Sequence, residues 1–403
     1  MNYQEAIEVL FTKLPMFQRS GPAAYKANLA GIKSVCTMLG NPENDLKYIH
    51  IAGTNGKGTV AHMLSAILQS TGYKVGLFTS PHLLDFRERI KINGEMIAES
   101  DVIDFVEEYS NHWCNPSFFE LTFGMALEYF SRSKVDIVIL ETGMGGRLDS
   151  TNVIPTAEVC VVTNVGLDHQ QFLGDTVREI AGEKAGIIKH GIPVVLGRMR
   201  SIAQSVILEH ALKKSAEMYY GRYIPIGLCE DLSPCFEENA STAYEAARVL
   251  KLQGWDIDEN IVIESINNYR SISDQRGRGE FISASEGLGS LIIDCAHNID
   301  GVKTLMSSLQ SKLHIVFGSV GDKDPTGVLE LIPKDSVMYW CAANQPRSMN
   351  VKKLARFGSL VGLNGEHYRS VSDAVEAARR ATWNLSEEQA LVCGSVFVVG
   401  EVL

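Results

Sequence analysis

The feature that most constrains this chain is a glycine-rich loop between a short apolar segment and an amphipathic one. Residues Tyr48–Ala52 (YIHIA) are mostly apolar and include β-branched side chains, as expected of a strand. The loop GTNGKGT (residues 53–59) follows, and from Val60 to Ser70 apolar residues recur at helical spacing. The pattern predicts a strand, a loop and a helix in succession, which is the geometry of a phosphate-binding loop.

The residue types within this loop support phosphate binding. Glycines let backbone N–H groups close around phosphate oxygens, and the helix N-terminus adds positive potential. Lys57 would neutralise β/γ-phosphate charge, and the Thr59 hydroxyl suits a magnesium ion. The loop departs from the general G-x-x-x-x-G-K-[ST] pattern, because Ile51 stands at the first glycine position and Gly58 separates the lysine from the threonine. An ordinary glycine turn is the alternative reading.

Apolar runs alternate with amphipathic segments along the first part of the chain, which predicts a doubly wound, mostly parallel α/β domain. Further strands are expected at Lys74–Phe78, Val135–Leu140, Val159–Val165 and Pro193–Leu196, and helices at Asp101–Trp113, Phe118–Phe130 and Thr176–Lys189.

A second series of strands and helices predicts a smaller, Rossmann-like α/β domain at the C-terminus. Strands are expected at Leu291–Cys295, His314–Gly318, Val337–Cys341 and Leu391–Cys393, and helices at Val302–Leu309 and Ser372–Thr382. The segment Ser271–Gly279 is polar and glycine-rich, so we expect a linker there. Because 403 residues exceed what one core usually serves, we expect two domains, residues 1–275 and 276–403.

Composition excludes several classes of partner. The net charge of −11 leaves no broad basic surface, so nucleic acid and anionic membranes are not expected partners. The eight cysteines are scattered without a C-x-x-C pair, and several lie in apolar runs, as expected of buried, reduced thiols. The N-terminus lacks the layout of a signal peptide, and no apolar run is long enough to span a membrane. A cytoplasmic protein is therefore expected.

Acidic and glycine residues follow the predicted strand at 135–140. Glu141 comes directly after the strand, and the segment TGMGGRLD (residues 142–149) continues it. A carboxylate at the carboxyl end of a buried strand, facing a phosphate loop, has the chemistry of a hard-cation ligand. The glycines leave room for a substrate to approach the backbone. A purely structural or helix-capping acid is the alternative.

Three longer motifs carry a family resemblance: HIAGTNGKGT, TSPHLLDFRERI and ETGMGGRLDSTN. The first resembles the loop of the Mur-ligase superfamily, and together they resemble the folylpolyglutamate synthase and dihydrofolate synthase family. The resemblance implies an ATP- and Mg²⁺-dependent ligase that joins L-glutamate to dihydropteroate or to a folate through an acyl phosphate. It further implies a monomer that acts on small molecules.

The resemblance assigns roles at the metal and phosphate centre. It implies that Ser80, in SPH, and Glu141 reach magnesium with Thr59, and that His169 serves a second magnesium. It also implies that Lys184 is carbamylated, which turns a cation into a carboxylate-like group. From sequence alone a serine before proline, such as Ser80, is more often a turn residue, and Lys184 is as readily a surface residue. The implied catalytic residues are Lys57, Glu141, His169 and Lys184.

The nucleotide-binding residues implied by the family lie in both expected domains. They are Thr54, Asn55, Gly56, Lys57, Gly58, Thr59, Asn239, Arg278, Asp294 and His297. Two departures weaken the match: Cys295 replaces the glycine of the D-G-A-H-N motif, and no proline precedes the glycine before Arg278. The flank of Asn239, Cys235-Phe236, also differs from the family pattern.

Two segments match the family's pteroate-binding regions. They supply Ser117, Phe118, Phe119, Glu120, Leu148, Asp149 and Ser150. One of the two phenylalanines is expected to stack on a pterin ring, unless both belong to the helix core. The segment Met16–Gly21 is a further substrate-side candidate, and Arg87-Glu88-Arg89 is either part of the motif or a solvated charge run.

Two alternatives to a folate ligase remain open at this level. A peptidoglycan-type Mur ligase shares the loop and the chemistry, although SPHLLDFRERI and GLDHQQFLGDT favour the folate branch. A nucleotide-binding regulator with degenerate catalysis is the other, although the intact Lys57, Glu141 and His169 speak against it. Glutamate-dependent ATP turnover with dihydropteroate distinguishes an enzyme from a regulator.

Overall fold

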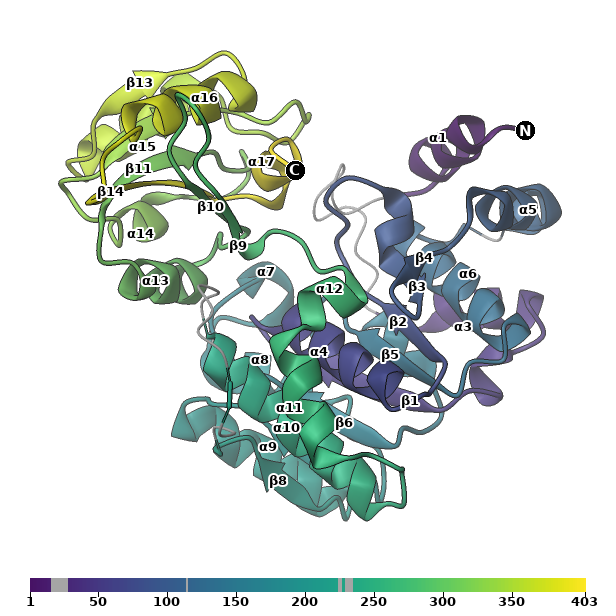
Figure 1. The fold of residues 1–403 in the computed structure, drawn as a ribbon. Coiled ribbons are helices and arrows are strands. Elements are labelled where there is room, and N and C mark those ends of the chain that lie inside the picture. Colours follow the sequence, from purple (N-terminus) through teal and green to yellow (C-terminus); the bar gives the residue numbers. More distant parts are fainter. Residues whose placement is uncertain (16–27, 114, 224–226, 229–234) are drawn as a thin grey trace. The chain divides into compact units, whose positions relative to one another are not determined.

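The computed structural model describes residues 1–15, 28–113, 115–223, 227–228 and 235–403. The chain divides into two compact units (Figure 1): unit 1 comprises Met1–Cys229 and Glu237–Gln275, and unit 2 comprises Glu230–Phe236 and Arg276–Leu403. The candidate substrate segment Met16–Gly21 lies outside the described residues.

Unit 1 is built on an eight-stranded sheet with the order β4-β3-β2-β5-β1-β6-β7-β8. All neighbours from β2 to β8 pair in parallel, whereas β3 is antiparallel to both β2 and β4. The strands are β1 Tyr48–Ala52, β2 Val75–Phe78, β3 Ile90–Ile92, β4 Glu95–Met96, β5 Ile137–Glu141, β6 Val159–Val162, β7 Val194–Leu196 and β8 Met218–Tyr220. The central strands β1, β2, β5 and β6 are buried along their whole length, as near-continuous apolar sequence predicts.

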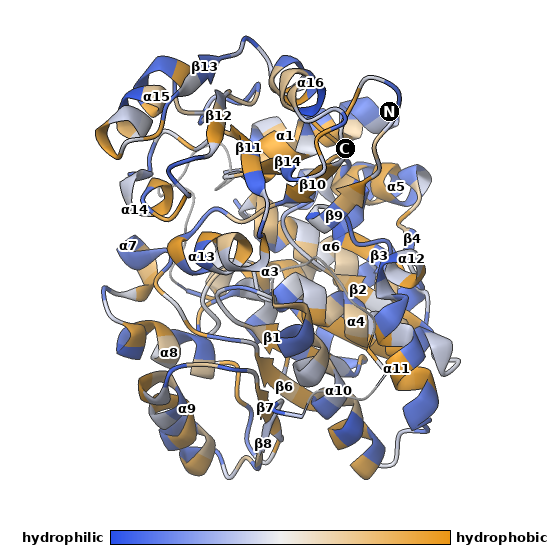
Figure 2. Ribbon diagram, turned by 60° about the vertical axis from the view of Figure 1, so that its left-hand side comes forward, coloured by the Kyte–Doolittle hydropathy of each residue, from blue (hydrophilic) through white to orange (hydrophobic). Residues whose placement is uncertain are grey.

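Helices cover both faces of this sheet. On one face, α3 (Ala30–Met38), α6 (Phe118–Arg132), α8 (Val177–Ala185) and α9 (Ser201–Lys213) share a core with alternate strand residues such as Tyr48, Phe78 and Leu140. On the other, α4 (Lys57–Ser70) contacts β1, β2 and β5, and α11 (Glu259–Asn267) and α12 (Tyr269–Ser273) pack on α4. Figure 2 shows hydrophobic strands at the centre of this arrangement.

Unit 1 contains further helices. They are α1 Tyr3–Lys13, α5 Glu99–Tyr109, α7 Gln170–Leu173 and α10 Phe236–Leu252, with short 3-10 helices η2 Pro42–Asn44, η3 Phe86–Arg89, η4 Ser110–His112 and η5 Ser150–Val153. The first residue of α10, Phe236, is grouped with unit 2, and the rest of the helix belongs to unit 1.

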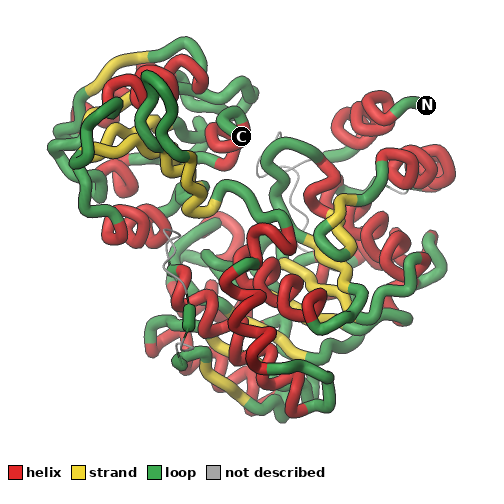
Figure 3. The backbone as a smooth tube through the Cα atoms, viewed as in Figure 1, coloured by secondary structure: helices red, strands yellow, loops and turns green. Residues whose placement is uncertain are grey.

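Unit 2 contains a six-stranded sheet with the order β13-β12-β11-β14-β10-β9, parallel except for β9. Helix α16 (Val371–Ala381) packs on β11, β12 and β14, while α13, α14 and α15 share a core with the opposite face. The other elements are β9 Arg278–Ile282, β10 Leu291–Asp294, β11 Lys312–Phe317, β12 Val337–Trp340, β13 Gly365–His367, β14 Glu388–Cys393, α13 Ile299–Ser308, α14 Thr326–Leu329, α15 Val351–Leu360 and α17 Val396–Gly400. Strands and helices alternate in each unit (Figure 3).

The expected fold class is confirmed, but several boundaries differ. The helix predicted over Thr176–Lys189 ends at Ala185, where Gly186, a residue of low helix propensity, is the C-cap. The segment Ser271–Gly279 is not a structureless linker, since α12 runs to Ser273 and β9 begins at Arg278. Hydrogen bonds from His62 to Ser273 and from Lys91 to Asp274 order this stretch, although it has no apolar period.

Cysteines and apolar helices behave as composition suggests. Cys36, Cys160, Cys295, Cys341 and Cys393 are buried free thiols, whereas Cys235 is partly exposed. Within the described ranges no helix is both long enough and apolar enough to cross a bilayer.

Two glycine-to-alanine changes should shift stability in opposite directions. In β2, a methyl group on Gly76 would stand 2.9 Å from the buried Phe130 ring, so Gly76→Ala should cost about 1–3 kcal/mol through overpacking. In α8, Gly182 has open space around its Cα, so Gly182→Ala should gain up to about 1 kcal/mol from helix propensity.

Chemical denaturation of both variants checks this packing. The same chemical change serves as its own control, because only the surroundings differ. Equal shifts of the unfolding midpoint in the two variants would contradict the described environment of β2.

Candidate active site

The glycine-rich loop joins β1 to α4, and the end of β6 fixes its shape. Gly56 adopts the left-handed conformation (φ 80°) that begins the helix. The backbone N–H of Asn55 donates to Asn164 Oδ1 at 2.9 Å, and Thr163 Oγ1 donates to the Asn55 carbonyl at 2.6 Å. Residues 55–58 remain partly exposed, so the loop is both held in place and accessible.

Two lysines meet at one carbonyl oxygen of this loop. Lys57 Nζ donates to the Gly53 oxygen at 3.1 Å and to the Thr54 oxygen at 3.3 Å. Lys184 Nζ donates to the same Gly53 oxygen at 2.7 Å from a buried position on α8. Burial and the neighbouring Lys57 ammonium lower the pKa of Lys184 to about 7, although Asp168 and Asp149 oppose the shift.

Glu141 lies at the same sheet edge as the loop. It ends β5, where it pairs in register with Ile51 of β1, and it is 5% exposed. Its Oε2 accepts the Ser80 backbone N–H at 3.0 Å. A methyl group on Gly58 would lie 3.5 and 3.6 Å from the two Glu141 carboxylate oxygens. The lysine loop and the acid therefore converge, as the sequence requires if both serve one nucleotide.

The residues around Glu141 suit a divalent cation with few protein ligands. Glu141 supplies a buried carboxylate, and the hydroxyl-bearing Thr59 and Ser80 come from the helix start and the end of β2. Across the described residues no group of three or more His, Cys, Asp or Glu side chains forms a metal cluster. Mg²⁺ commonly takes only one or two carboxylates together with phosphate oxygens and water, so this oxygen-rich set fits it.

A buried acid shapes the glycine segment after Glu141. Asp149 accepts the Met144 backbone N–H at 2.8 Å through Oδ2, and both the N–H and the hydroxyl of Thr151 through Oδ1. Burial raises the pKa of Asp149, although these hydrogen bonds oppose the shift. His50 Nε2 lies 2.8 Å from the Thr151 hydroxyl beneath the segment. The acid thus holds the loop's backbone.

His169 follows β6 at the same edge of the sheet. It adopts the left-handed conformation (φ 51°) at the start of α7, an uncommon conformation for a non-glycine residue. Its backbone N–H donates to Asp168 Oδ1 at 2.9 Å, and its ring Nε2 lies 3.8 Å from Asp168 Oδ2. Asp168 is therefore a further acidic member of this edge.

Asn239 reaches the phosphate loop from α10. Its side-chain oxygen lies against Gly56, in the space that a methyl group there would fill. Asn239 is 7% exposed. The structure therefore brings Asn239 to the loop despite the weak match of its flanking sequence.

Comparison with known proteins agrees with this architecture. Residues 51–222 match the Mur ligase middle domain, and residues 277–396 match the Mur ligase glutamate ligase domain. The dihydrofolate synthase/folylpolyglutamate synthase of Bacillus subtilis is 30% identical over 412 residues, covering 94% of each protein. The chain belongs to the dihydrofolate synthase/folylpolyglutamate synthase family. The folate branch of the superfamily, which the motifs favoured, is confirmed.

Solved members of this family share the whole fold. Escherichia coli FolC in complex with DHPP and ADP superposes with a TM-score of 0.84 at 29% identity, covering 100% of this chain and 97% of that one. A bifunctional folylpolyglutamate synthase/dihydrofolate synthase with Mn, AMPPNP and L-glutamate bound gives a TM-score of 0.82 at 27% identity, covering 100% and 97%.

Within unit 2, the family's nucleotide residues form their own cluster. Arg278 in β9 pairs in register with Asp294 at the end of β10. The Asp294 carboxylate accepts the Gly279 N–H at 2.8 Å and the Ala296 N–H at 2.7 Å, and it is 3% exposed. His297 Nδ1 lies 2.8 Å from the Cys295 carbonyl, to which it donates. Asp294 therefore ties β9 to the turn that carries His297.

The segment of α6 that was expected to bind substrate contains both structural and accessible residues. Ser117 and Glu120 form a reciprocal capping box at the start of α6, a role that sequence analysis did not consider. Phe118 is 3% exposed and packs on Phe11 and Phe86, so it belongs to the core. Phe119 is only partly buried, and its ring borders Gly143. Leu148 and Ser150 are partly buried beside Asp149.

One buried residue near Glu141, Arg89, was not singled out by sequence reasoning. Arg89 is 2% exposed, so the solvated-charge interpretation is wrong for this residue. Its Nε donates to His82 Nδ1 at 2.7 Å, and its guanidinium lies 5.2 Å from the Phe118 ring centre. Burial lowers the pKa of Arg89 to about 10, while Glu88 and Glu141 act against the shift. Its place in DFRERI was the available signal.

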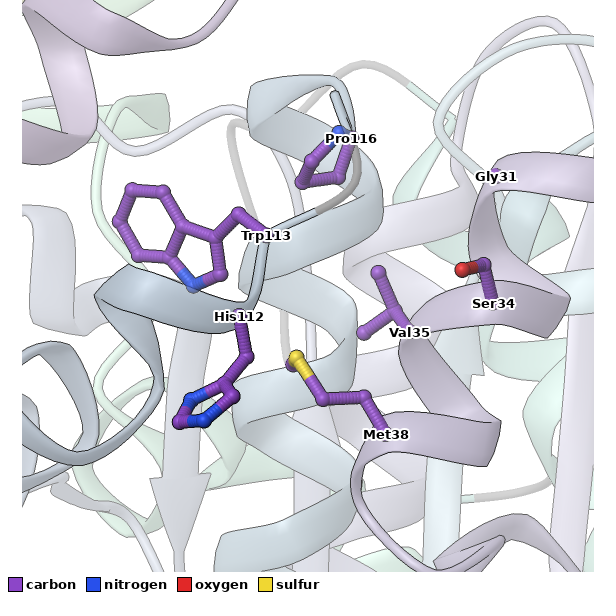
Figure 4. Close-up of a pocket in the computed structure, with 7 residues that line it drawn as sticks. All are labelled: Gly31, Ser34, Val35, Met38, His112, Trp113 and Pro116. Atoms are coloured by element: carbon purple, nitrogen blue, oxygen red, sulfur yellow. The ribbon is translucent and has the colours of Figure 1, made fainter.

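A separate, small pocket lies between α3 and the segment before α6 (Figure 4). Val35 and Met38 of α3 face His112 and Trp113 across it. None of the predicted nucleotide or metal residues lines this pocket. It is therefore not the centre formed by Lys57 and Glu141.

Proposed function

We propose that this chain is an ATP-dependent ligase that adds L-glutamate to dihydropteroate, to a folate γ-carboxylate, or to both. The observation that carries the proposal is the convergence of the Lys57 loop and the Glu141 carboxylate at one sheet edge. The relatives support the substrate class, because FolC was solved with DHPP and ADP, and a second relative with AMPPNP and L-glutamate.

The chemistry explains why these residues are needed. A carboxylate is a poor electrophile until transfer of the γ-phosphoryl group of ATP converts it to an acyl phosphate, which the glutamate amine then attacks. Lys57 is placed to turn from the carbonyl oxygens of residues 53 and 54 toward phosphate oxygens at the helix start. A divalent cation, proposed here as Mg²⁺, would offset the charge crowded between two anions.

The proposed roles extend over both units. In residues 1–275, Thr59, Ser80, Glu141 and His169 would serve the cation, and Asn239 with the loop would hold the nucleotide. In residues 276–403, the glutamate ligase domain, Arg278, Asp294 and His297 are proposed as further nucleotide contacts, and the tie between Asp294 and β9 gives these groups a rigid base. The Phe119 ring beside Gly143 would stack on the pterin.

Removing either converging group should abolish ligation while leaving the fold intact. Lys57→Ala and Glu141→Ala should each lower turnover by about a hundredfold or more, since each removes charge stabilisation in the transition state. Amide product and ADP release with glutamate and dihydropteroate provide the measurement. The exposed Lys251→Ala and Glu209→Gln variants are matched controls, and ligase turnover retained in either site variant would refute the assigned centre.

Phe119 should govern affinity for the pterin-bearing substrate. Phe119→Ala should raise KM for dihydropteroate or tetrahydrofolate about tenfold, because a stacking partner is lost, and should leave KM for ATP unchanged. Phe118→Leu should instead lower the melting temperature with little change in KM, since Phe118 lies in the core. The reverse pattern would assign the stacking role to Phe118.

Lys184 should take up CO₂ as the pH rises through its pKa. Only the neutral amine attacks CO₂, and a pKa of about 7 makes that form abundant near neutrality, whereas an ordinary lysine stays protonated. In bicarbonate, intact-protein mass spectrometry one unit above this pKa should show the added mass of one CO₂, which one unit below should largely disappear. Lys184→Arg should never show it, and an unmodified parent protein at the higher pH would exclude the carbamate.

A further inference from the structure

His50 is a fully buried histidine in β1, the strand that leads into the phosphate loop. Its Nε2 lies 2.8 Å from the Thr151 hydroxyl oxygen, and that hydroxyl donates to Asp149 Oδ1 at 2.6 Å. Burial and, to a smaller extent, the Lys189 ammonium lower the pKa of His50 to about 3, so the ring is neutral and carries one N–H. Because the Thr151 proton is used toward Asp149, the oxygen of Thr151 accepts from the His50 Nε2–H. The two hydrogen bonds therefore run in one direction, from His50 to Asp149.

The other ring nitrogen of His50 shows that packing does not explain a histidine here. With the proton on Nε2, Nδ1 is an acceptor, and it is enclosed without a donor among the residues that the structure describes. A buried acceptor without a donor disfavours the folded state. Tyr48 and Ala52, on the same side of β1, belong to the hydrophobic core. An apolar side chain at position 50 would therefore suit stability better.

The segment that carries Thr151, η5, is also held by contacts that do not involve His50. Lys189 Nζ donates to the Asn152 side-chain oxygen at 2.8 Å and to the Ile154 carbonyl at 2.9 Å. These contacts hold the backbone of η5 from within unit 1. The contribution of His50 therefore concerns the Thr151 hydroxyl and the carboxylate to which this hydroxyl donates.

The second oxygen of that carboxylate lies beside the candidate acceptor-binding ring. Asp149 Oδ2 accepts the Met144 N–H at 2.8 Å and would lie 3.3 Å from a methyl group placed on Gly143. The Phe119 ring would lie 2.8 Å from the same methyl group. Gly143, Met144 and Phe119 are partly exposed, whereas Asp149 is 6% exposed. The buried acid therefore supports the turn against which the accessible ring lies.

We propose that His50 is a positioning residue for the binding of the pterin-bearing acceptor. Its Nε2–H orients the Thr151 hydroxyl, and that hydroxyl fixes the Asp149 carboxylate. The carboxylate in turn holds the Gly143–Met144 turn beside the Phe119 ring. In a low-dielectric interior, consecutive hydrogen bonds polarise one another, so the His50 N–H also strengthens donation by Thr151. This inference rests on the proposed function, because it requires a pteroate or folate acceptor at Phe119.

Steady-state kinetics of a His50→Met variant, together with its melting temperature, test the role. KM for dihydropteroate or tetrahydrofolate should rise about threefold, while kcat and KM for ATP stay unchanged, since a coupling of this size is typical of neighbouring hydrogen-bonded groups. The melting temperature should be unchanged or higher, because the substitution removes the unpaired Nδ1. A histidine with a purely structural role would instead lower the melting temperature when replaced.

Variants of Thr151 test whether His50 acts through the hydroxyl. Thr151→Val should raise the acceptor KM about tenfold, since a hydrogen bond to a carboxylate is lost, and Thr151→Ser should restore it. Adding His50→Met to Thr151→Val should raise the acceptor KM no further, because the link between the two residues is already broken. Thr382→Val is the control, since Thr382 is a buried threonine of unit 2 whose hydroxyl donates to the Ala378 carbonyl at 3.2 Å.

The outcomes separate this inference from the proposed function. The positioning role is overturned if His50→Met leaves the acceptor KM unchanged, raises KM for ATP equally, lowers the melting temperature, or adds its effect to that of Thr151→Val. The proposed function survives each of these results as long as the parent protein forms the amide product and Phe119→Ala raises the acceptor KM. If the parent protein shows no acceptor-dependent ATP turnover, the proposed function falls and this inference falls with it.

Discussion

The parallel pairing of β1 with β5 is the constraint on which the candidate site depends. Parallel neighbours end at the same edge, so register alone places Glu141 beside Ile51, two residues before Gly53. On the other side of β1, β6 delivers Thr163 and Asn164, which hold the loop's backbone. A phosphate loop between two such strands needs little further support to keep its shape.

Buried or partly buried acids fix the surrounding loops through backbone N–H groups. Asp149 holds the glycine segment at Met144, and Glu88 accepts three successive N–H groups from Leu83 to Asp85. Glu120 accepts the backbone N–H of Ser117 at the start of α6. Irregular backbone must find partners somewhere, and a carboxylate can serve several donors at once. Two of these acids, Asp149 and Glu120, lie in the segments proposed to bind substrate, so their structural and functional readings overlap.

Sequence patterns predicted the parts of the fold with long apolar runs. The central strands β1, β5 and β6 have these runs, and their order along the chain with intervening helices indicates a doubly wound sheet. The edge strands β4 and β8 are short and partly exposed, so their sequences carry little periodic signal. The same holds for β9, an antiparallel strand in a polar, glycine-rich stretch.

The sequence predicted the site residues that belong to a motif at the end of a strand. It did not predict those whose position depends on tertiary contacts. Lys57 and Glu141 follow predicted strands, so topology alone brings them together. Arg89 lies in a run of charges, and only its packing against His82 and Phe118 shows that it is buried. The order of residues 273 and 274 depends on His62 and Lys91, which are distant in sequence, so no local pattern predicts it.

The strand order of unit 1 also separates the residues proposed for phosphoryl transfer from the ring proposed for acceptor binding. Lys57, Glu141 and His169 follow β1, β5 and β6, whereas the candidate acceptor-binding ring, Phe119, packs against Phe78 of β2, on the side of β5 away from β6. Changes on the β2 side therefore leave the Lys57 loop's supports at Thr163 and Asn164 untouched. A scaffold divided in this way lets acceptor selectivity diverge while the activation chemistry stays constant, which suits a family whose members extend either a pteroate or a folate.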